Sequence, residues 1–529
     1  MSQWHIRVPK GGLRHSKPKP SSARWVISGI FTLSIIFLYM TARNEWISAV
    51  ENAMPISKVT EPSDKNSLRF SPVPTDIEGS QQVNSSSAST DAELLEKPVI
   101  SAATSEVVSD IVDTTPKSDT LDKCDGRLIY IYNLAKEFNR LVVEQCSNWE
   151  AWPNMCEDIS NQGFGVPLQV PASDPMASIL QPPDAWFRTD QFTLEIVFHE
   201  RLKVHPCLTK NSEEASLFYL PFYHGLDLAQ NLYNSDLAVR DRLNELFVKW
   251  LRSQKPWQRH HGKRHVLVLG RIVWDFVRKI GKDASWGSSL LTQPELTNVT
   301  KLLIERSLWE DSMLGIPYPT AFHPSSESDL RAWQHTVRTF DRRQLVSLAG
   351  STRTKKLTGV IRDEVFDQCT NSISCRTIFC NIERCVERPQ IILKMGLESV
   401  FCLQPPGDSS TRKGVFDSLE TGCIPVIFNK HQAPNQYLMH LPADHNDYSV
   451  LVPEEEVCNR TFDIMEHLSK IPPSEIARKQ KCIVDLIPRL LYRHPKPVGE
   501  YTSRDAFDVA MDGLMARFDA EQANSGAQL

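Results

Sequence analysis

Residues 401–426, FCLQPPGDSSTRKGVFDSLETGCIPV, carry the pattern that decides the fold of this 529-residue chain. Apolar runs at both ends of the stretch are typical of short buried strands. A helix is predicted between them, from Thr411 to Leu419, with Val415 and Phe416 on its buried side. Gly422 supplies the residue type that commonly ends a helix. The stretch therefore predicts a strand, a tight Pro-Pro-Gly loop, a helix and a returning strand, as in a parallel α/β sheet.

The start of this helix is suited to binding an anion. Small hydroxyl residues precede it as candidate N-caps, and free N–H groups with the helix dipole favour negative charge there. Arg412 adds a planar fork of donors that matches phosphate oxygens. A stably capped helix with a surface Arg–Asp pair is the alternative, but a cap alone does not need the Pro-Pro-Gly loop. We predict a diphosphate site made by Gly407, Ser409, Ser410, Thr411, Arg412, Lys413 and Asp417, the last accepting hydrogen bonds from ribose hydroxyls.

Strands and helices alternate on both sides of this unit. Predicted strands cover 126–133, 215–223, 265–270, 301–304, 344–350, 399–403 and 424–428, and predicted helices cover 190–204, 237–251, 359–367 and 475–491. Alternation at this spacing favours βαβ units and parallel sheets. We expect two successive α/β domains, over 123–340 and 341–485, followed by a C-terminal helix and tail over 486–529.

The N-terminal part of the chain has a different character. Residues 1–24 carry six Lys or Arg and no acidic residue, and residues 25–42, WVISGIFTLSIIFLYMTA, carry no charge. That length is near the minimum for a membrane-spanning helix, and bulky apolar residues up to Met40 favour an uncleaved anchor over a signal peptide. Positive charge before the span predicts a cytosolic tail and a lumenal remainder. Residues 43–122, rich in Ser, Thr and Pro, are expected to form a disordered stem.

Cysteine usage agrees with a lumenal location. All 12 cysteines lie between positions 124 and 482, which favours disulfides. The crowded group Cys369, Cys375, Cys380 and Cys385 also favours disulfides, since zinc ligands usually come in closer pairs. Sequons at Asn84, Asn298 and Asn459 are compatible with glycosylation. A net charge of −5 gives no indication of a nucleic-acid partner.

Residues 401–426 resemble the nucleotide-binding signature of the exostosin-like glycosyltransferases, most closely the plant xyloglucan galactosyltransferase branch. WFRTDQF at 186–192, LPFYHGLD at 220–227, GRIVWDF at 270–276 and IPYPTAFHP at 316–324 resemble the same branch, in the same order. The resemblance implies a GT-B architecture, two Rossmann-like domains facing a cleft, with a UDP-sugar on the second domain. It also implies inversion at the anomeric carbon, UDP-galactose as donor and xyloglucan as acceptor. It further implies a type II protein of the Golgi membrane that forms complexes with other Golgi glycosyltransferases.

Two kinds of alternative remain open at this point. A galacturonosyl or arabinosyl donor would use the same scaffold with different contacts around the sugar. A non-catalytic glycan-binding or scaffold subunit of a Golgi complex would need neither a base nor a donor site, and the presence of Arg412 and Asp417 argues against it.

An inverting transfer needs a base for the acceptor hydroxyl and positive charge for the departing UDP. We expect the base in the N-terminal domain, and Asp275 ranks first because it follows a strand and a turn. The further candidates are Asp227, His323 and Glu195, and each of the four is equally compatible with a cap or an ion pair. Arg271 and Trp274 are candidates for lining the sugar or acceptor site. The sequence has no Asp-x-Asp metal motif at the candidate site, so the donor is expected to bind without a bivalent cation.

Overall fold

The computed structural model describes residues 124–149, 155–278, 286–351, 359–407 and 409–526. All of them belong to one compact unit, Ser109–Leu529. The expected tail, membrane span and stem, residues 1–122, lie outside the described residues. Among the helices that are described, none is both long and apolar enough to cross a bilayer.

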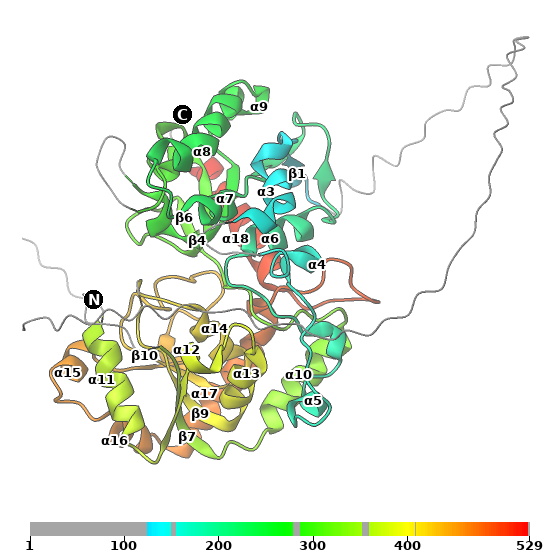
Figure 1. Cartoon of the computed structure of the whole chain (residues 1–529). Helices are drawn as coiled ribbons and strands as arrows, with labels where there is room; N and C mark the ends of the chain where they lie inside the picture. Colours follow the sequence, from blue (N-terminus) through cyan, green and yellow to red (C-terminus); the bar gives the residue numbers. More distant parts are fainter. Residues whose placement is uncertain (1–123, 150–154, 279–285, 352–358, 408, 527–529) are drawn as a thin grey trace, which may run out of the picture. The chain divides into compact units, whose positions relative to one another are not determined.

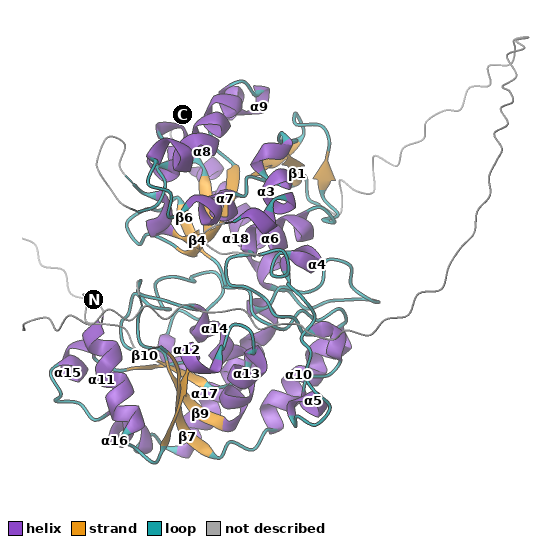
Figure 2. Ribbon diagram, in the orientation of Figure 1, coloured by secondary structure: helices purple, strands orange, loops and turns teal. Residues whose placement is uncertain are grey.

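The first sheet is wholly parallel, with the strand order β2-β1-β3-β4-β5-β6. Figure 2 draws the strands of both sheets in orange. Its strands are β1 (Leu128–Ile131), β2 (Leu208–Thr209), β3 (Ala215–Leu220), β4 (His265–Ile272), β5 (Thr300–Glu305) and β6 (Met313–Gly315). The sequence predictions for β1, β3, β4 and β5 are confirmed. The edge strands β2 and β6 have two and three residues, too few to show a periodic pattern.

Both faces of the first sheet are buried, because alternate side chains of its strands enter different cores. Val266 and Val268 of β4 pack into one core, and Leu267 and Leu269 into another. The first core includes residues of α6 (Leu194–Leu202) and α18 (Ala506–Gly526), and the second includes residues of α3 (Arg140–Glu144), α7 (His224–Asn231), α8 (Leu237–Arg252) and α9 (Lys255–His260).

The second sheet is also wholly parallel, with the order β11-β10-β9-β7-β8. Its strands are β7 (Gln344–Gly350), β8 (Cys375–Phe379), β9 (Ser399–Leu403), β10 (Ile424–Ile427) and β11 (Val450–Leu451). The helices α11 (Gly359–Thr370), α15 (Glu454–Cys458) and α16 (Ile464–Ser469) lie on one side, and α13 (Pro389–Glu398), α14 (Lys413–Glu420) and α17 (Pro473–Leu486) on the other (Figure 1). The predicted β7, β9, β10 and α11 are confirmed, and β8 and α13 were not predicted.

The two sheets share one order of connection. In each, the chain begins on an inner strand, passes to one edge and then crosses back, so the order reverses between β1 and β3 and between β7 and β9. Ligands of open α/β sheets bind at the carboxyl ends of the strands beside such a reversal. The parallel α/β class predicted from the sequence is therefore confirmed, and the topology points to the loops after β7 and β9.

Five disulfides link the described cysteines: Cys124–Cys207, Cys146–Cys156, Cys369–Cys375, Cys380–Cys385 and Cys402–Cys423. The crowded group at 369–385 thus forms two disulfides, as predicted. The predicted use of cysteines in disulfides is therefore confirmed for these ten, while Cys458 on α15 and Cys482 on α17 carry free thiols.

Candidate active site

A cavity of about 390 Å³ lies where the topology predicts a ligand. Ala349 of β7, Ser351 after it and Gln404 after β9 line it, together with residues from the start of α14. Thr189, Asp190 and Gln191, which precede α6 of the first sheet, line the same cavity. Side chains that follow strands of the second sheet therefore share one cavity with side chains associated with the first.

The start of α14 differs from the prediction. The helix begins at Lys413 rather than Thr411, and Arg412 is its N-cap residue with no side-chain cap. The Ser409 hydroxyl and the Thr411 backbone N–H donate instead to the carboxylate of Glu305, at the end of β5. The hydroxyl residues before the helix are therefore not its cap, and the described residues supply no side-chain acceptor to the end of α14 that faces the cavity.

Arg412 lines the cavity with a guanidinium that no described residue neutralises. Its Nε is buried and has no hydrogen-bond partner. The group packs over Gly407, where a Cβ would collide with Nη2, so a larger residue at this position would displace the guanidinium. An Arg side chain with buried, unused donors is suited to a phosphate group.

Lys413 and Asp417 form an ion pair across one turn of α14, with 2.5 Å between Nζ and Oδ1. Both side chains line the cavity. The Arg–Asp pair considered as the alternative for this helix is therefore absent from the described structure, because Asp417 pairs with Lys413. The predicted contact between Asp417 and a ribose stays a prediction.

The unit around α14 is closed at both ends. Gly422 follows the helix with φ +71°, and the Cys423 N–H donates to the Ser418 carbonyl at 3.0 Å, which confirms the predicted helix stop. The disulfide Cys402–Cys423 joins β9 to the residue before β10. The loop and helix that carry Arg412 are thus fixed between two adjacent strands.

The predicted base Asp275 is buried and fully engaged. Its Oδ2 accepts from Arg271 Nε at 2.7 Å, and its Oδ1 accepts from Trp286 Nε1 at 2.6 Å. The second candidate, Asp227, is also buried and lies 3.2 Å from His224 Nδ1. Neither residue is among the described residues that line the cavity.

The other two candidate bases, Glu195 and His323, contact residues of neighbouring segments. Glu195 on α6 accepts from the N–H groups of Gly225 at 2.7 Å and Gly270 at 3.3 Å, and burial raises the pKa of its carboxyl to about 8. His323 stacks on Phe164, and burial lowers its pKa to about 3, so the ring is neutral. Neither lines the cavity in the described structure, and the catalytic role of all four candidates stays a prediction.

Two carboxylates were missed. Asp190 lines the cavity, and burial raises its pKa to about 6. Glu305 accepts from the Tyr318 hydroxyl at 2.5 Å, and burial raises its pKa to about 7. Asp190 is the first residue of a predicted helix, and Glu305 directly follows a predicted strand. Many structural acids occupy such positions, so the sequence alone does not distinguish these two.

Arg271 and Trp274, both predicted to line the sugar or acceptor site, differ in exposure. Arg271 is buried, while Trp274 is 66% exposed.

Of the sequons, Asn298 and Asn459 are exposed and Asn84 lies outside the described residues. In the part of the chain that the structure describes, no group of three or more His, Cys, Asp or Glu side chains is placed to hold a metal ion.

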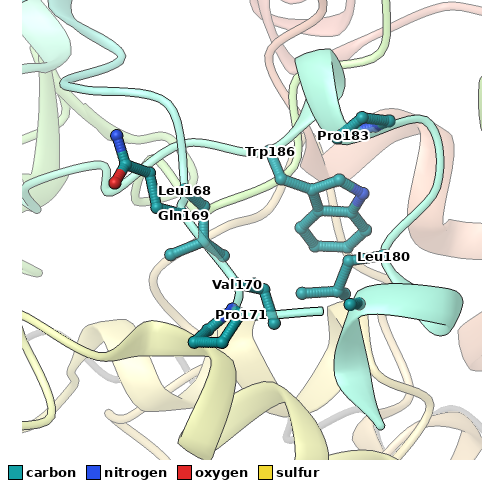
Figure 3. Close-up of a pocket in the computed structure, with 8 residues that line it drawn as sticks. Leu168, Gln169, Val170, Pro171, Leu180, Pro183 and Trp186 are labelled. Atoms are coloured by element: carbon teal, nitrogen blue, oxygen red, sulfur yellow. The ribbon is translucent and has the colours of Figure 1, made fainter. Parts of the chain in front are cut away.

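A second hollow, of about 530 Å³, is built by the segment before α6 (Figure 3). Leu168, Val170, Leu180 and Trp186 give it an apolar wall. Trp186 is stacked on Phe322 with its ring centroid 4.6 Å away, which leaves little ring surface for a ligand. The hollow has no cationic side chain among its described lining residues and does not suit a diphosphate.

Comparison with known proteins agrees with the geometry. The exostosin GT47 domain model matches residues 123–467. A probable xyloglucan galactosyltransferase of Arabidopsis thaliana is 39% identical over 402 residues, 76% of this chain and 78% of the relative. A xyloglucan galactosyltransferase of the same plant is 39% identical over 406 residues, 76% of this chain and 77% of the relative. A xyloglucan-specific galacturonosyltransferase, again from that plant, is 41% identical over 397 residues, 74% of this chain and 57% of the relative.

Two parallel sheets, a cavity lined by an Arg that no described residue neutralises, and these relatives define a glycosyltransferase. The chain belongs to the exostosin GT47 family. A solved glycosyltransferase of Rickettsia africae aligns over 74% of this chain and 98% of its own, at 7% identity and a TM-score of 0.29.

Proposed function

We propose that this glycosyltransferase moves galactose from UDP-galactose to side chains of xyloglucan, with inversion at the anomeric carbon, in a GT-B arrangement. The observation that carries the proposal is the Arg412 guanidinium, which lines the cavity without a described acceptor. The names of the relatives support galactose as the sugar and xyloglucan as the acceptor.

The donor diphosphate would lie between Arg412 and the first turn of α14. The uncapped helix start and Arg412 both offer positive charge to the departing UDP. Lys413 would add a second cation once Asp417 turns to the ribose. We propose that these charges hold the donor without a bivalent cation, so that transfer should persist in the presence of a chelator.

The acceptor would bind on exposed aromatic side chains beside Asp275. Trp274 and Tyr233 are each 66% exposed and Trp286 is 37% exposed. Asp275 holds the Trp286 indole, whose ring centroid lies 5.9 Å from that of Tyr233. Flat, half-apolar rings held in one place suit the apolar faces of a glucan chain.

Trp274→Ala tests this acceptor surface. We expect the KM for xyloglucan to rise about tenfold, corresponding to about 1.4 kcal/mol, with the KM for UDP-galactose unchanged. Trp309, 88% exposed and outside the group, provides the matched control as Trp309→Ala. Equal effects of the two substitutions on the acceptor KM would remove the surface from the proposal.

A galacturonosyl donor is the second candidate, and the galacturonosyltransferase among the relatives favours it. Arg362 of α11 is buried and also lines the cavity. A third cationic side chain beside Arg412 and Lys413 would suit the carboxylate of galacturonic acid.

We further propose that the chain is a single-pass type II protein of the Golgi membrane. Residues 1–24 would be cytosolic, 25–42 would form the anchor and 43–122 the stem. The charge pattern of the N-terminus and five disulfides, which form in oxidising compartments, support this. Asn84, Asn298 and Asn459 would be available for glycosylation, and association with other Golgi glycosyltransferases belongs to the same proposal.

The decisive test is transfer by the full chain to xyloglucan from a panel of UDP-sugars. We expect turnover of UDP-galactose, and turnover of UDP-galacturonic acid alone would select the second candidate. Arg412→Ala should weaken UDP binding, measured by calorimetry, by about 10- to 150-fold, the value of a charged hydrogen bond. Arg343→Ala is the control, because that side chain is exposed and pairs with Asp341. Unchanged UDP affinity in Arg412→Ala would overturn the donor site.

A further inference from the structure

We propose that Asp190 is the general base that takes the proton from the attacking acceptor hydroxyl. The inference rests on the proposed function, since a base is needed only if a hydroxyl attacks the donor sugar. It departs from the four candidates that the sequence suggested, and it comes from the cavity itself.

The position of Asp190 in the cavity suits a general base. Asp190 lines the cavity together with Arg412, Lys413 and Asp417. Arg412, Lys413 and Asp417 belong to the second sheet's phosphate-binding unit, while Asp190 precedes α6 of the first sheet. Inversion requires the acceptor to attack from the side opposite the departing phosphate, so a base carried by the first sheet's loops fits that geometry.

Hydrogen bonds within the turn before α6 orient the Asp190 side chain. Asp190 Oδ1 accepts from the Phe192 N–H at 2.8 Å, and the Thr193 hydroxyl donates to the Asp190 carbonyl at 3.0 Å. The turn before α6 therefore fixes the backbone and one carboxylate oxygen. No described residue is recorded as a partner of Oδ2. One oxygen is held and the other is left to receive a proton, as a base requires.

The other described carboxylates in and near the cavity are already engaged by neighbouring groups. Asp190 and Asp417 are the carboxylates among the described residues that line the cavity. Asp417 is ion-paired to Lys413 on the phosphate side. Asp275 and Glu305 have their oxygens taken by Arg271, Trp286, Tyr318 and the Ser409–Thr411 loop. Asp190 is the described carboxylate left on the acceptor side.

Burial and the charges around Asp190 leave its carboxylate ionised, and able to accept a proton, near neutral pH. Burial raises its pKa to about 6, and Asp158 acts in the same direction. Arg271, whose guanidinium lies over the Phe192 ring, and Lys413 act in the opposite direction. The carboxylate is thus ionised above about pH 6 and more basic than an exposed Asp, which favours proton transfer.

The step balances without a further reactant. The acceptor oxygen forms its bond to the anomeric carbon as its proton passes to Asp190 Oδ2. The bond from that carbon to the UDP oxygen breaks, and UDP leaves with the electron pair toward Arg412 and the start of α14. Asp190 then returns its proton to solvent.

The test compares the full chain with three variants, measuring transfer from UDP-galactose and UDP affinity by calorimetry. Asp190→Asn should lower kcat about 100- to 10,000-fold, with UDP affinity changed less than about twofold and the melting temperature unchanged. Asp190→Glu should recover part of the rate. Asp158→Asn is the matched control: this carboxylate pairs with Arg188 and does not line the cavity in the described structure.

The pH dependence adds a readout that a structural role would not move. The kcat/KM of the wild type should fall about tenfold per pH unit below about pH 6. In Asp158→Asn this limb should move to lower pH, because a negative charge near Asp190 is removed.

The possible failures are distinguishable. Retention of the wild-type kcat and pH limb by Asp190→Asn would overturn the base while leaving the donor site and the function intact. Absence of transfer by the wild type from every UDP-sugar would overturn the base and the proposed function together. Lost UDP binding in a folded Asp190→Asn chain would show that the residue belongs to the donor site instead.

Discussion

At the scale of single residues, Glu420 shows how burial sets a protonation state in this protein. It ends α14, its Oε1 accepts from the Phe322 N–H at 3.1 Å, and the Thr320 hydroxyl is a second neighbour of its buried carboxyl group. Burial raises its pKa from 4.5 to about 8, so the folded chain holds a proton there that the unfolded chain releases above pH 4.5. The contribution of Glu420 to the free energy of unfolding therefore decreases as the pH rises from about 4.5 to 8.

Glu420→Gln should remove that part of the pH dependence. A Gln side chain is always neutral, and its carbonyl can keep the bond to Phe322 N–H. We expect the variant to match the wild type at pH 5.5 and to be more stable at pH 8, by on the order of 3 kcal/mol. Urea unfolding at both pH values measures this, with Glu455→Gln, an exposed carboxylate of α15, as control. A wild type no less stable than Glu420→Gln at pH 8 would contradict the assignment.

Residue roles were predictable where they depend on local pattern. The sequence predicts the place of Arg412 beside a helix start because such a cation has the same surroundings in most folds, and its contact with a phosphate stays a prediction. The base was not predictable in this way. Asp275 follows a predicted strand and Asp190 begins a predicted helix, and neither position reveals the partners of its carboxylate. Only the placement of Arg271 and Trp286 shows that Asp275 is engaged. Tertiary contacts decide which carboxylate is left for chemistry.

At the scale of elements, the disulfide Cys402–Cys423 constrains the proposed phosphate-binding unit. It closes a separation of 21 residues that contains the Pro-Pro-Gly loop and α14. Cross-links of this span stabilise a fold by about 3 kcal/mol. Because Arg412 lies inside the closed loop, the disulfide should also preserve the geometry of the donor site.

Replacing both cysteines, Cys402→Ala with Cys423→Ala, should therefore lower the free energy of unfolding by about 3 kcal/mol and weaken UDP binding. The disulfide Cys369–Cys375 is the control, since it closes only 6 residues and neither cysteine is among the described residues lining the cavity. Calorimetric titration with UDP and urea unfolding give the two readouts. UDP affinity equal in both double variants would show that the Cys402–Cys423 link is structural only.

Most elements of the two sheets were predicted, and those that were missed have physical reasons. The strands β2 and β11 have two residues each, so no alternation can appear. The helix α10 (Glu327–Thr339) was overlooked despite a capping box between Ser326 and Asp329, a local signal that was available. The start of α14 was placed early because Ser409 and Thr411, plausible caps by type, are used by Glu305.

At the scale of the whole molecule, the C-terminal chain returns to the first sheet. Phe507 of α18 packs on Phe198 of α6, with ring centroids 4.7 Å apart. Arg201 of α6 is 3% exposed and pairs with Asp505, 1% exposed, and with Asp508. The region 486–529 was predicted only as a helix and tail, because a contact spanning 304 residues leaves no local pattern.

Arg201→Ala should therefore destabilise the chain strongly. Removing one partner of a buried ion pair costs about 3–5 kcal/mol. Among the described residues, Asp505 would keep only Arg493, 3.9 Å away, as a counter-charge. Arg127→Ala is the matched control: Arg127 pairs with Asp519 of the same helix at 3.0 Å, but both side chains are about half exposed, so the loss should be under about 1 kcal/mol. Urea unfolding measures both, and equal losses would contradict the assignment of Arg201 as the anchor of the C-terminal helix.

Arg201→Ala should also alter the candidate active site, because α6 begins directly after the turn that carries Asp190. If α18 holds α6 against the first sheet, loosening it should displace that turn while leaving the loop of Arg412, on the second sheet, in place. Arg201→Ala is therefore expected to lower kcat for sugar transfer more than it weakens UDP binding, under conditions where the variant remains folded. A variant with reduced stability but unchanged kcat would show that packing within the first sheet alone is enough to position Asp190.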